Sequence, residues 1–232
     1  MAKDKKKSNS NILQLWPTHV MNKRFSHFQK VNPALIQLFN QHMDKENVKN
    51  RHAYASHDRL LAEYPNHTEL GELAQFIKDN VFELAAEVNG QYWGQRASIE
   101  IFMTGIWFQI SNNYNFHETH THGNCSWSGV YYVQSGNASK GPEDHVGKQP
   151  NGVTRFYGPG LDIGGGGHGE AGNLYLHDYA YDSYPQDGKL VIFPSHLKHM
   201  VFPYNGEQDR IVVSFHVQIK NSQGDTWNYQ FR

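Results

Sequence analysis

Asn115 to Val133 reads NFHETHTHGNCSWSGVYYV, and Gly188 to Tyr204 reads GKLVIFPSHLKHMVFPY. Each segment combines histidines with a run of β-branched and aromatic residues, which favour strands. Residues two apart in a strand point to the same side, so we expect His120, His122 and Glu118 to share one face. The two segments therefore predict a β-sheet structure that carries a histidine site.

A metal site is the most specific interpretation of these histidines. His199, in the second segment, is the best candidate for a third ligand beside His120 and His122. Two ligands close in sequence and one far downstream are typical of a facial triad, whose open positions accept oxygen or substrate. The H-x-H spacing alone is weak evidence in a chain of 232 residues with 15 histidines. Together the three residues favour a mononuclear iron site.

Composition excludes several classes of protein. A chain of 232 residues can bury one full core, and a formal net charge of −1 predicts no clear nucleic-acid surface. No apolar run approaches the roughly 18 residues that a membrane span needs. The single cysteine, Cys125, cannot form an internal disulfide, so we expect a cytoplasmic location. The sequence does not predict an oligomeric state.

The chain divides into a tail, a helical part and a strand-rich part. Residues 1–12 are expected to be a disordered basic tail, and residues 13–232 a single domain, helical to about 95 with a barrel from about 97. Helices followed by many short strands indicate an α+β, mainly β, structure built around a jelly-roll barrel. We expect strands near residues 97–111 (with a bulge or break at Gly105), 127–134, 153–157, 173–178, 188–193, 199–203, 210–218 and 226–231.

Two helices are expected to cover the barrel. Pro33 is expected to open the first, because proline is tolerated in the first turn. The second is expected to begin near Asn66, which forms a capping-box pattern with Glu69, and to end at Asn89-Gly90. Its apolar stripe has helical spacing and consists of Leu70, Leu73, Ile77, Val81, Leu84 and Val88.

The segment DRIVVSFHVQ has two distinct faces if it is a strand. Alternation places Arg210, Val212, Ser214 and His216 on one face and Ile211, Val213, Phe215 and Val217 on the other. The apolar face is expected to pack against a covering helix, which turns Arg210 into the barrel. A buried arginine needs an anion, and its planar fork suits a carboxylate. That carboxylate belongs either to a ligand or to a protein side chain.

A glycine-rich segment, GPGLDIGGGGHGEAG at residues 158–172, follows the middle strands. No helix start follows it, so a phosphate-binding loop is not expected. We expect either a mobile lid over the barrel mouth or a disordered segment. The polar residues in and after it are expected at the surface: His168, Glu170, His177 and Asp178.

The ordered set H-T-H, S-G-V-Y-Y-V, G-x-L-x-x-F-P-S-x-L-x-H-x-V and R-I-x-x-S-F resembles the 2-oxoglutarate-Fe(II) oxygenases, most closely their uncharacterised bacterial and phage branch. The resemblance spans about Ser56 to His216. It implies a double-stranded β-helix that uses Fe(II), 2-oxoglutarate and dioxygen to hydroxylate an organic substrate, releasing succinate and CO2. By motif, His120 and His122 match the first ligand pair, His199 the distal ligand, and Arg210 the arginine that binds the 2-oxoglutarate tail. Further candidates for contact with 2-oxoglutarate are Ser214, Gln109 and the hydroxyl of Tyr132 or its neighbour Tyr131.

The sequence departs from the superfamily pattern in three places. The usual H-x-D or H-x-E is H-x-H here, so Glu118 is the alternative ligand if His122 does not bind. Val212 stands where a serine often follows the arginine by two residues. Trp107-Phe108-Gln109 stands in place of Trp-x-Asn, so any amide role falls to Gln109.

Two other functions stay open. A cupin-type metalloenzyme without 2-oxoglutarate also fits H-x-H followed by Gly188, Pro194 and His199. Against it, the glutamate usual after H-x-H is absent, and His196 stands at the cupin glycine position. A non-catalytic jelly-roll module for binding or structure would need no metal. No motif selects a substrate.

Overall fold

The computed structural model describes residues 17–90, 92–93, 98–158 and 180–221. Several sequence expectations concern residues outside these ranges: the basic tail, nearly all of the glycine-rich segment with its polar neighbours, and the strands near residues 173–178 and 226–231. They stay predictions, as does the organisation of residues 13–232 as a single domain.

The described residues contain three α-helices, one 3-10 helix and ten strands, joined by turns and loops. The helices are α1 (Phe28–Lys45), α2 (Leu60–Glu63), α3 (Thr68–Asn89) and the 3-10 helix η2 (Pro142–His145). The strands are β1 (Met21–Arg24), β2 (Ala53–Ala55), β3 (Ile99–Ser111), β4 (Asn115–His120), β5 (Trp127–Gln134), β6 (Thr154–Tyr157), β7 (Ala180–Ser183), β8 (Lys189–Pro194), β9 (His199–Tyr204) and β10 (Arg210–Asn221).

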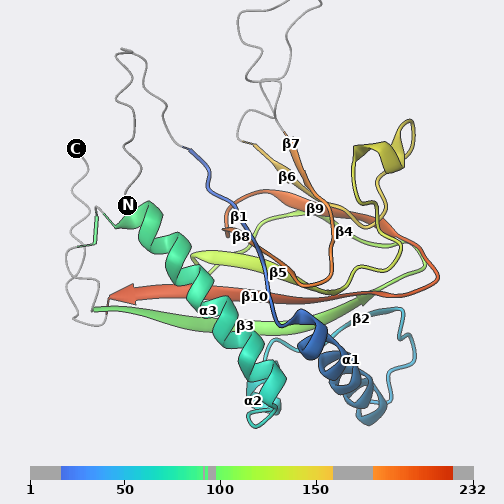
Figure 1. Cartoon of the computed structure of the whole chain (residues 1–232), viewed down its shortest axis with the longest axis horizontal. Helices are drawn as coiled ribbons and strands as arrows, with labels where there is room; N and C mark the ends of the chain where they lie inside the picture. The colour runs from blue at the N-terminus through green and yellow to red at the C-terminus, as the bar shows by residue number, and fades with distance from the viewer. Residues whose placement is uncertain (1–16, 91, 94–97, 159–179, 222–232) are drawn as a thin grey trace, which may run out of the picture.

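The strands form two antiparallel sheets that pack face to face (Figure 1). The six-stranded sheet has the order β1-β8-β5-β10-β3-β2, and the four-stranded sheet has the order β4-β9-β6-β7. Strands distant in sequence are neighbours, and from β3 to β10 the chain alternates between the sheets, except that the consecutive strands β6 and β7 pair within the four-stranded sheet. This arrangement is a double-stranded β-helix, and it confirms the predicted α+β, mainly β, jelly-roll class with covering N-terminal helices.

Two separate apolar cores follow from the alternation along β10. Ile211, Val213, Phe215 and Val217 lie in the larger core, between the six-stranded sheet and helices α1 and α3 (Figure 1). The predicted stripe of α3 is buried in the same core, with Val88 partly buried at its end. Val212 faces the other way, into the smaller core between the two sheets. The prediction of two faces on this strand is therefore confirmed.

The predicted start of the first long helix is wrong, whereas α3 begins near Asn66 as predicted. Helix α1 begins at Phe28, so Pro33 lies in its second turn. The earlier start is fixed by Asn32, whose side chain donates to the Val133 carbonyl at 2.7 Å and accepts from the Tyr131 hydroxyl at 2.6 Å. Such bonds to a distant strand leave no local sequence pattern.

The capping box predicted at the start of α3 is also wrong. The N-cap is His67, whose Nδ1 accepts a hydrogen bond from the Leu70 backbone N–H at 3.2 Å. An imidazole nitrogen can replace the usual hydroxyl or carboxylate because it is also a local acceptor. The predicted end at Asn89 is confirmed.

The predicted irregularity at Gly105 is a β-bulge. His216 of β10 pairs with Gly105, but the next residue, Val217, pairs with Met103, so Thr104 is the extra residue. The short strands β1 and β2 and helix α2 were not predicted, because each spans four residues or fewer.

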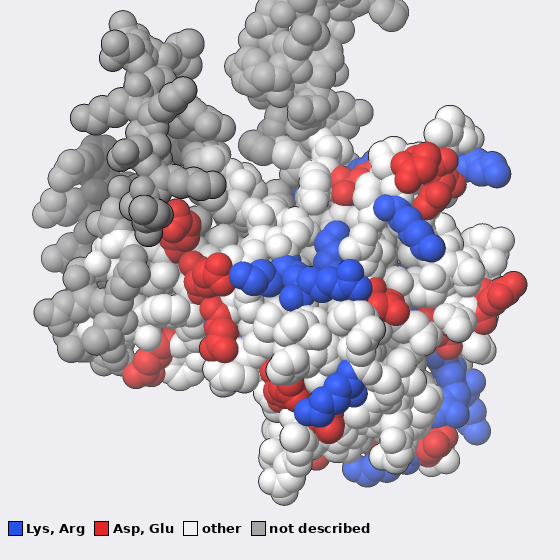
Figure 2. Space-filling model, viewed as in Figure 1, with Lys and Arg blue, Asp and Glu red and all other residues white. Residues whose placement is uncertain are grey.

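The surface agrees with the nearly balanced charge of the sequence. Figure 2 shows acidic and basic side chains interspersed on the face that it displays. Within the described ranges, no helix has both the length and the apolar composition needed to cross a membrane. Cys125 is a free thiol.

Candidate metal centre

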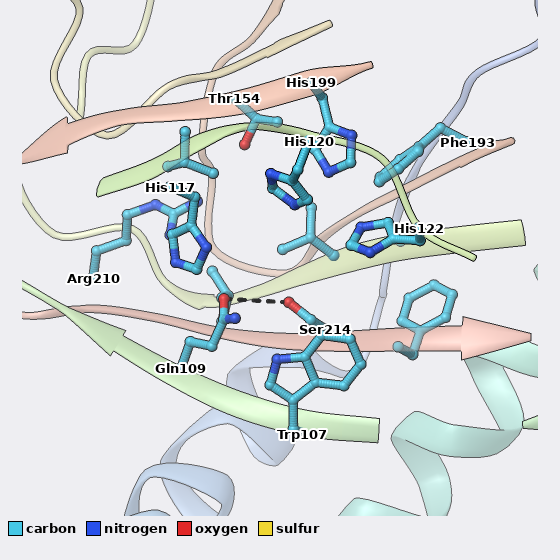
Figure 3. Close-up of a pocket in the computed structure, with 15 residues that line it drawn as sticks. Trp107, Gln109, His117, His120, His122, Thr154, Phe193, His199, Arg210 and Ser214 are labelled. Carbon is cyan, nitrogen blue, oxygen red and sulfur yellow. Dashed lines mark hydrogen bonds between the residues drawn. The ribbon is translucent and has the colours of Figure 1, made fainter. Parts of the chain in front are cut away.

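Three histidines meet at the end of the four-stranded sheet. His120, the last residue of β4, pairs directly with His199, the first residue of β9. His122 follows β4 by two residues, and its backbone N–H donates to the Ser195 carbonyl at 2.9 Å. One ring nitrogen from each histidine lies within 4.8 Å of the others (Figure 3). The structure therefore brings together all three residues of the predicted triad.

Backbone carbonyls orient two of the three rings. Nδ1 of His120 lies 2.6 Å from the Glu118 carbonyl oxygen, and Nδ1 of His199 lies 2.8 Å from the Leu197 carbonyl oxygen. An Nδ1–H that donates to each carbonyl leaves Nε2 with a free lone pair. Metal-binding histidines commonly use their second nitrogen in this way, which fixes the tautomer and the ring orientation.

The surroundings of His122 and His199 keep these two imidazoles neutral. Burial, together with the neighbouring histidines, lowers the pKa of His199 to about 4 and that of His122 to about 3. A neutral imidazole is the form that binds a metal. A further histidine, His216, has its ring centre 4.5 Å from that of His122, and burial lowers its pKa as well.

The expectation that Glu118 shares the ligand face is wrong. His117 pairs with Val201 and His120 with His199, so three residues of β4 span the same length as two residues of β9. This bulge interrupts the alternation and leaves the Glu118 side chain exposed, while His117 and His120 both face inward. Glu118 lies outside the cluster of possible ligands in the described residues. Its carboxylate is therefore not placed to complete the triad.

The histidines open onto a cavity of about 60 Å³ between the two sheets (Figure 3). This volume holds several water molecules or part of a small ligand. Nine of its lining residues were not proposed from the sequence as site residues: Trp107, His117, Gly129, Val130, Thr154, Phe193, Val201, Val212 and Phe215. His117 was not predicted as a site residue, because regular alternation would place it on the strand face opposite His120.

Arg210 lies at the other end of the cavity. Its side chain is only 2% exposed, and its Nε has no hydrogen-bonding partner. No carboxylate in the described part of the chain forms an ion pair with it; its guanidinium carbon lies 5.2 Å from the centre of the Tyr132 ring. Burial lowers its pKa, because the charged group has lost its water. A buried cation in this state favours an anionic ligand.

The other predicted contacts divide into two groups. Ser214 and Gln109 line the cavity, with the Ser214 Oγ 3.5 Å from the Gln109 Oε1. Tyr132 lies behind the wall, and its hydroxyl is 3.1 Å from the hydroxyl of Thr154, which does line the cavity. Tyr131 faces the helices instead, where it hydrogen-bonds to Asn32.

The donor set fits Fe(II) together with a dicarboxylate. Three imidazoles from one face leave the opposite coordination positions open, as mononuclear iron oxygenases require. The cavity joins this face to an unpaired arginine, which suits the far carboxylate of a ligand chelated at the metal.

Comparison with known proteins agrees with this chemistry. Residues 105–216 match the model of a family described as "Putative 2OG-Fe(II) oxygenase". This part of the chain is similar to the 2OG-Fe(II) oxygenases. The matched range runs from Gly105 to His216 and so includes every residue of the cavity. The members of this family use Fe(II) as cofactor and 2-oxoglutarate as cosubstrate. No curated protein sequence matches the chain.

Solved structures share the fold of this chain. HygX from Streptomyces hygroscopicus, solved with nickel and 2-oxoglutarate bound, superposes with a TM-score of 0.55 at 13% identity, over 87% of this chain and 82% of HygX. SnoN, an α-ketoglutarate-dependent epimerase from nogalamycin biosynthesis, gives 0.52 at 10% identity, over 86% and 76% of the two chains. AviO1 from Streptomyces viridochromogenes gives 0.50 at 12%, over 87% and 90%. At these identities the likeness shows the fold alone.

Proposed function

We propose that this chain is an Fe(II)- and 2-oxoglutarate-dependent dioxygenase that hydroxylates an organic substrate and releases succinate and CO2. His120, His122 and His199 hold the iron, and Arg210 binds the distal carboxylate of 2-oxoglutarate. Ser214, Gln109 and Tyr132, the last through Thr154, support the cosubstrate. The observation that carries this proposal is that three imidazoles line one cavity together with a buried guanidinium that forms no ion pair with a carboxylate of the described residues.

The protein contributes binding and orientation to this chemistry. When bound, iron and 2-oxoglutarate supply an oxidant strong enough for C–H bonds. The backbone carbonyls behind His120 and His199 hold the metal-facing nitrogens in position. The apolar walls, Phe193 and Val212, limit the access of water to the metal face.

Metal loading and turnover test the proposal together. Protein purified without oxygen is expected to bind one Fe(II) per chain, and to form succinate from 2-oxoglutarate when oxygen is admitted with a suitable substrate. Iron binding without any binding of 2-oxoglutarate would favour the cupin-type alternative, and no metal binding would favour a non-catalytic module. The epimerase among the similar folds makes product analysis necessary, because succinate release alone does not identify hydroxylation.

A cytoplasmic location accompanies this proposal. It is supported by Cys125, which is unpaired and needs no oxidising compartment. Dioxygen, 2-oxoglutarate and an organic substrate are the proposed partners.

A further inference from the structure

His117 owes its position to the bulge in β4. In a strand without a bulge, residues three apart such as His117 and His120 would point to opposite faces. The bulge puts Glu118 and Thr119 outside together and leaves both imidazoles facing inward. Bulges next to active sites commonly redirect a side chain in this way.

The register of the four-stranded sheet places His117 one step from the metal face. His120 pairs with His199, whereas His117 pairs with Val201, which in turn pairs with Thr154 on β6. Two residues along a strand correspond to about 6.6 Å. A five-carbon dicarboxylate that is chelated at the metal would extend over a comparable distance toward His117.

His117 does not belong to the ligand cluster itself. Its ring centre lies 6.3 Å from that of His120, whereas the ring centres of His120, His122 and His199 lie 4.3–5.0 Å from one another. Figure 3 shows the ring of His117 beside the side chain of Arg210, on the Gln109 side of the cavity. It therefore lies where the anion for Arg210 is expected.

His117 can donate a hydrogen bond to an anion while its ring stays neutral. Burial, and then the charge of Arg210, lower its pKa to about 4, so the ring is neutral at neutral pH. A neutral imidazole has one N–H donor and one acceptor nitrogen. In the described part of the chain the ring has no hydrogen-bonding partner, so its N–H is available to a ligand.

We infer that His117 donates a hydrogen bond to the distal carboxylate of 2-oxoglutarate and forms, with Arg210, a two-residue clamp for that group. This inference rests on the proposed function. The donor explains why the strand carries a bulge at this point, and it adds a neutral donor where a second cation would repel Arg210. His117 is thus a binding and specificity residue for the cosubstrate.

Calorimetry of anaerobic, metal-loaded protein tests the clamp. We expect His117→Leu to weaken 2-oxoglutarate binding by about tenfold, the size expected for one hydrogen bond to a charged group. His117→Gln keeps a donor and should change the affinity by less than about threefold. The matched ligand is 2-oxopentanoate, which has the same chain length without the distal carboxylate. Its affinity should be the same in the wild type and in His117→Leu, which also controls for folding.

The possible outcomes distinguish an error in the clamp from an error in the proposed function. If the wild type binds 2-oxoglutarate and His117→Leu binds it equally well, the clamp is wrong and the proposed function stands. Equal weakening of both oxo acids would also overturn the clamp, because the loss would then not depend on the distal carboxylate. Loss of metal binding in His117→Leu would assign His117 to the metal instead. No 2-oxoglutarate binding by the metal-loaded wild type would overturn the proposed function and the clamp together.

Discussion

His120 is hydrogen-bonded to Glu118 through the backbone, with Nδ1 2.6 Å from the carbonyl oxygen, while the Glu118 carboxylate points to solvent. Glu118→Gln is therefore expected to bind iron with an affinity within about twofold of the wild type. Anaerobic titration with Fe(II) measures this. Loss of iron in Glu118→Gln, with His122→Ala unaffected, would return the carboxylate to the metal.

His199→Ala is expected to abolish iron binding or weaken it by more than a hundredfold, because His199 is buried and meets His120 across the strand pair. The matched control is His196→Ala, three residues earlier, where the histidine is exposed and outside the ligand cluster. The control should bind iron like the wild type. Equal iron affinity in both variants would show that this triad is wrong.

Arg210→Gln is expected to raise the apparent KM for 2-oxoglutarate by roughly tenfold to a hundredfold. Hydrogen bonds to charged groups contribute on the order of 1.5–3 kcal/mol, and about 1.4 kcal/mol corresponds to a factor of ten. Iron affinity should hardly change, because the arginine is not a ligand. The readout is succinate formation against 2-oxoglutarate concentration, with exposed Lys198→Gln as control. An unchanged constant would favour an enzyme that does not use 2-oxoglutarate.

Gly129→Ala is expected to destabilise the fold by about 1–3 kcal/mol, the usual cost of overpacking. A Cβ at this position would overlap the Phe215 ring and lie 2.5 Å from the Val191 carbonyl oxygen, which belongs to the neighbouring strand. Gly71→Ala is the control: it lies in α3 with open space around it, and should stabilise by about 0.5–1 kcal/mol. Urea unfolding measures both. A Gly129→Ala protein as stable as the wild type would contradict the close packing.

The metal-free protein is expected to lose stability between pH 6.5 and 4. Burial depresses the pKa values of His117, His122 and His199 to about 4, 3 and 4, against 6.5 in the unfolded chain. Between these pH values the unfolded chain binds more protons than the folded chain. The free energy of unfolding therefore decreases as the pH falls below 6.5. The urea midpoint should be lower at pH 5 than at pH 7.5, and less so in His199→Gln. Equal midpoints at both pH values would refute the depressed pKa values.

Sequence reasoning succeeded where strands pair regularly. Along β10, alternation correctly separated Arg210 and Val212 from Ile211 and Val213, because this part of the strand pairs without interruption with β3, and the extra residue in the pairing with β5 lies on β5. The stripe of α3 was predictable for the same reason, since its period is local and regular.

It failed where a single residue changes the register. The bulge in β4 moved Glu118 away from the site and brought His117 into it, and no residue type in NFHETH marks such a change. The start of α1 depends on Asn32, whose partners on β5 lie about a hundred residues away in sequence. Long-range bonds of this kind are decided by tertiary packing rather than by local propensity.

The larger apolar core and the histidine-lined cavity lie on opposite faces of the six-stranded sheet. The larger core, under α1 and α3, contains most of the buried apolar side chains, whereas the cavity lies in the smaller core between the sheets. Residues such as Trp107 and Ser214 can therefore be exchanged with little effect on the helix-covered scaffold. The cavity wall can thus vary while the larger core under α1 and α3 stays unchanged.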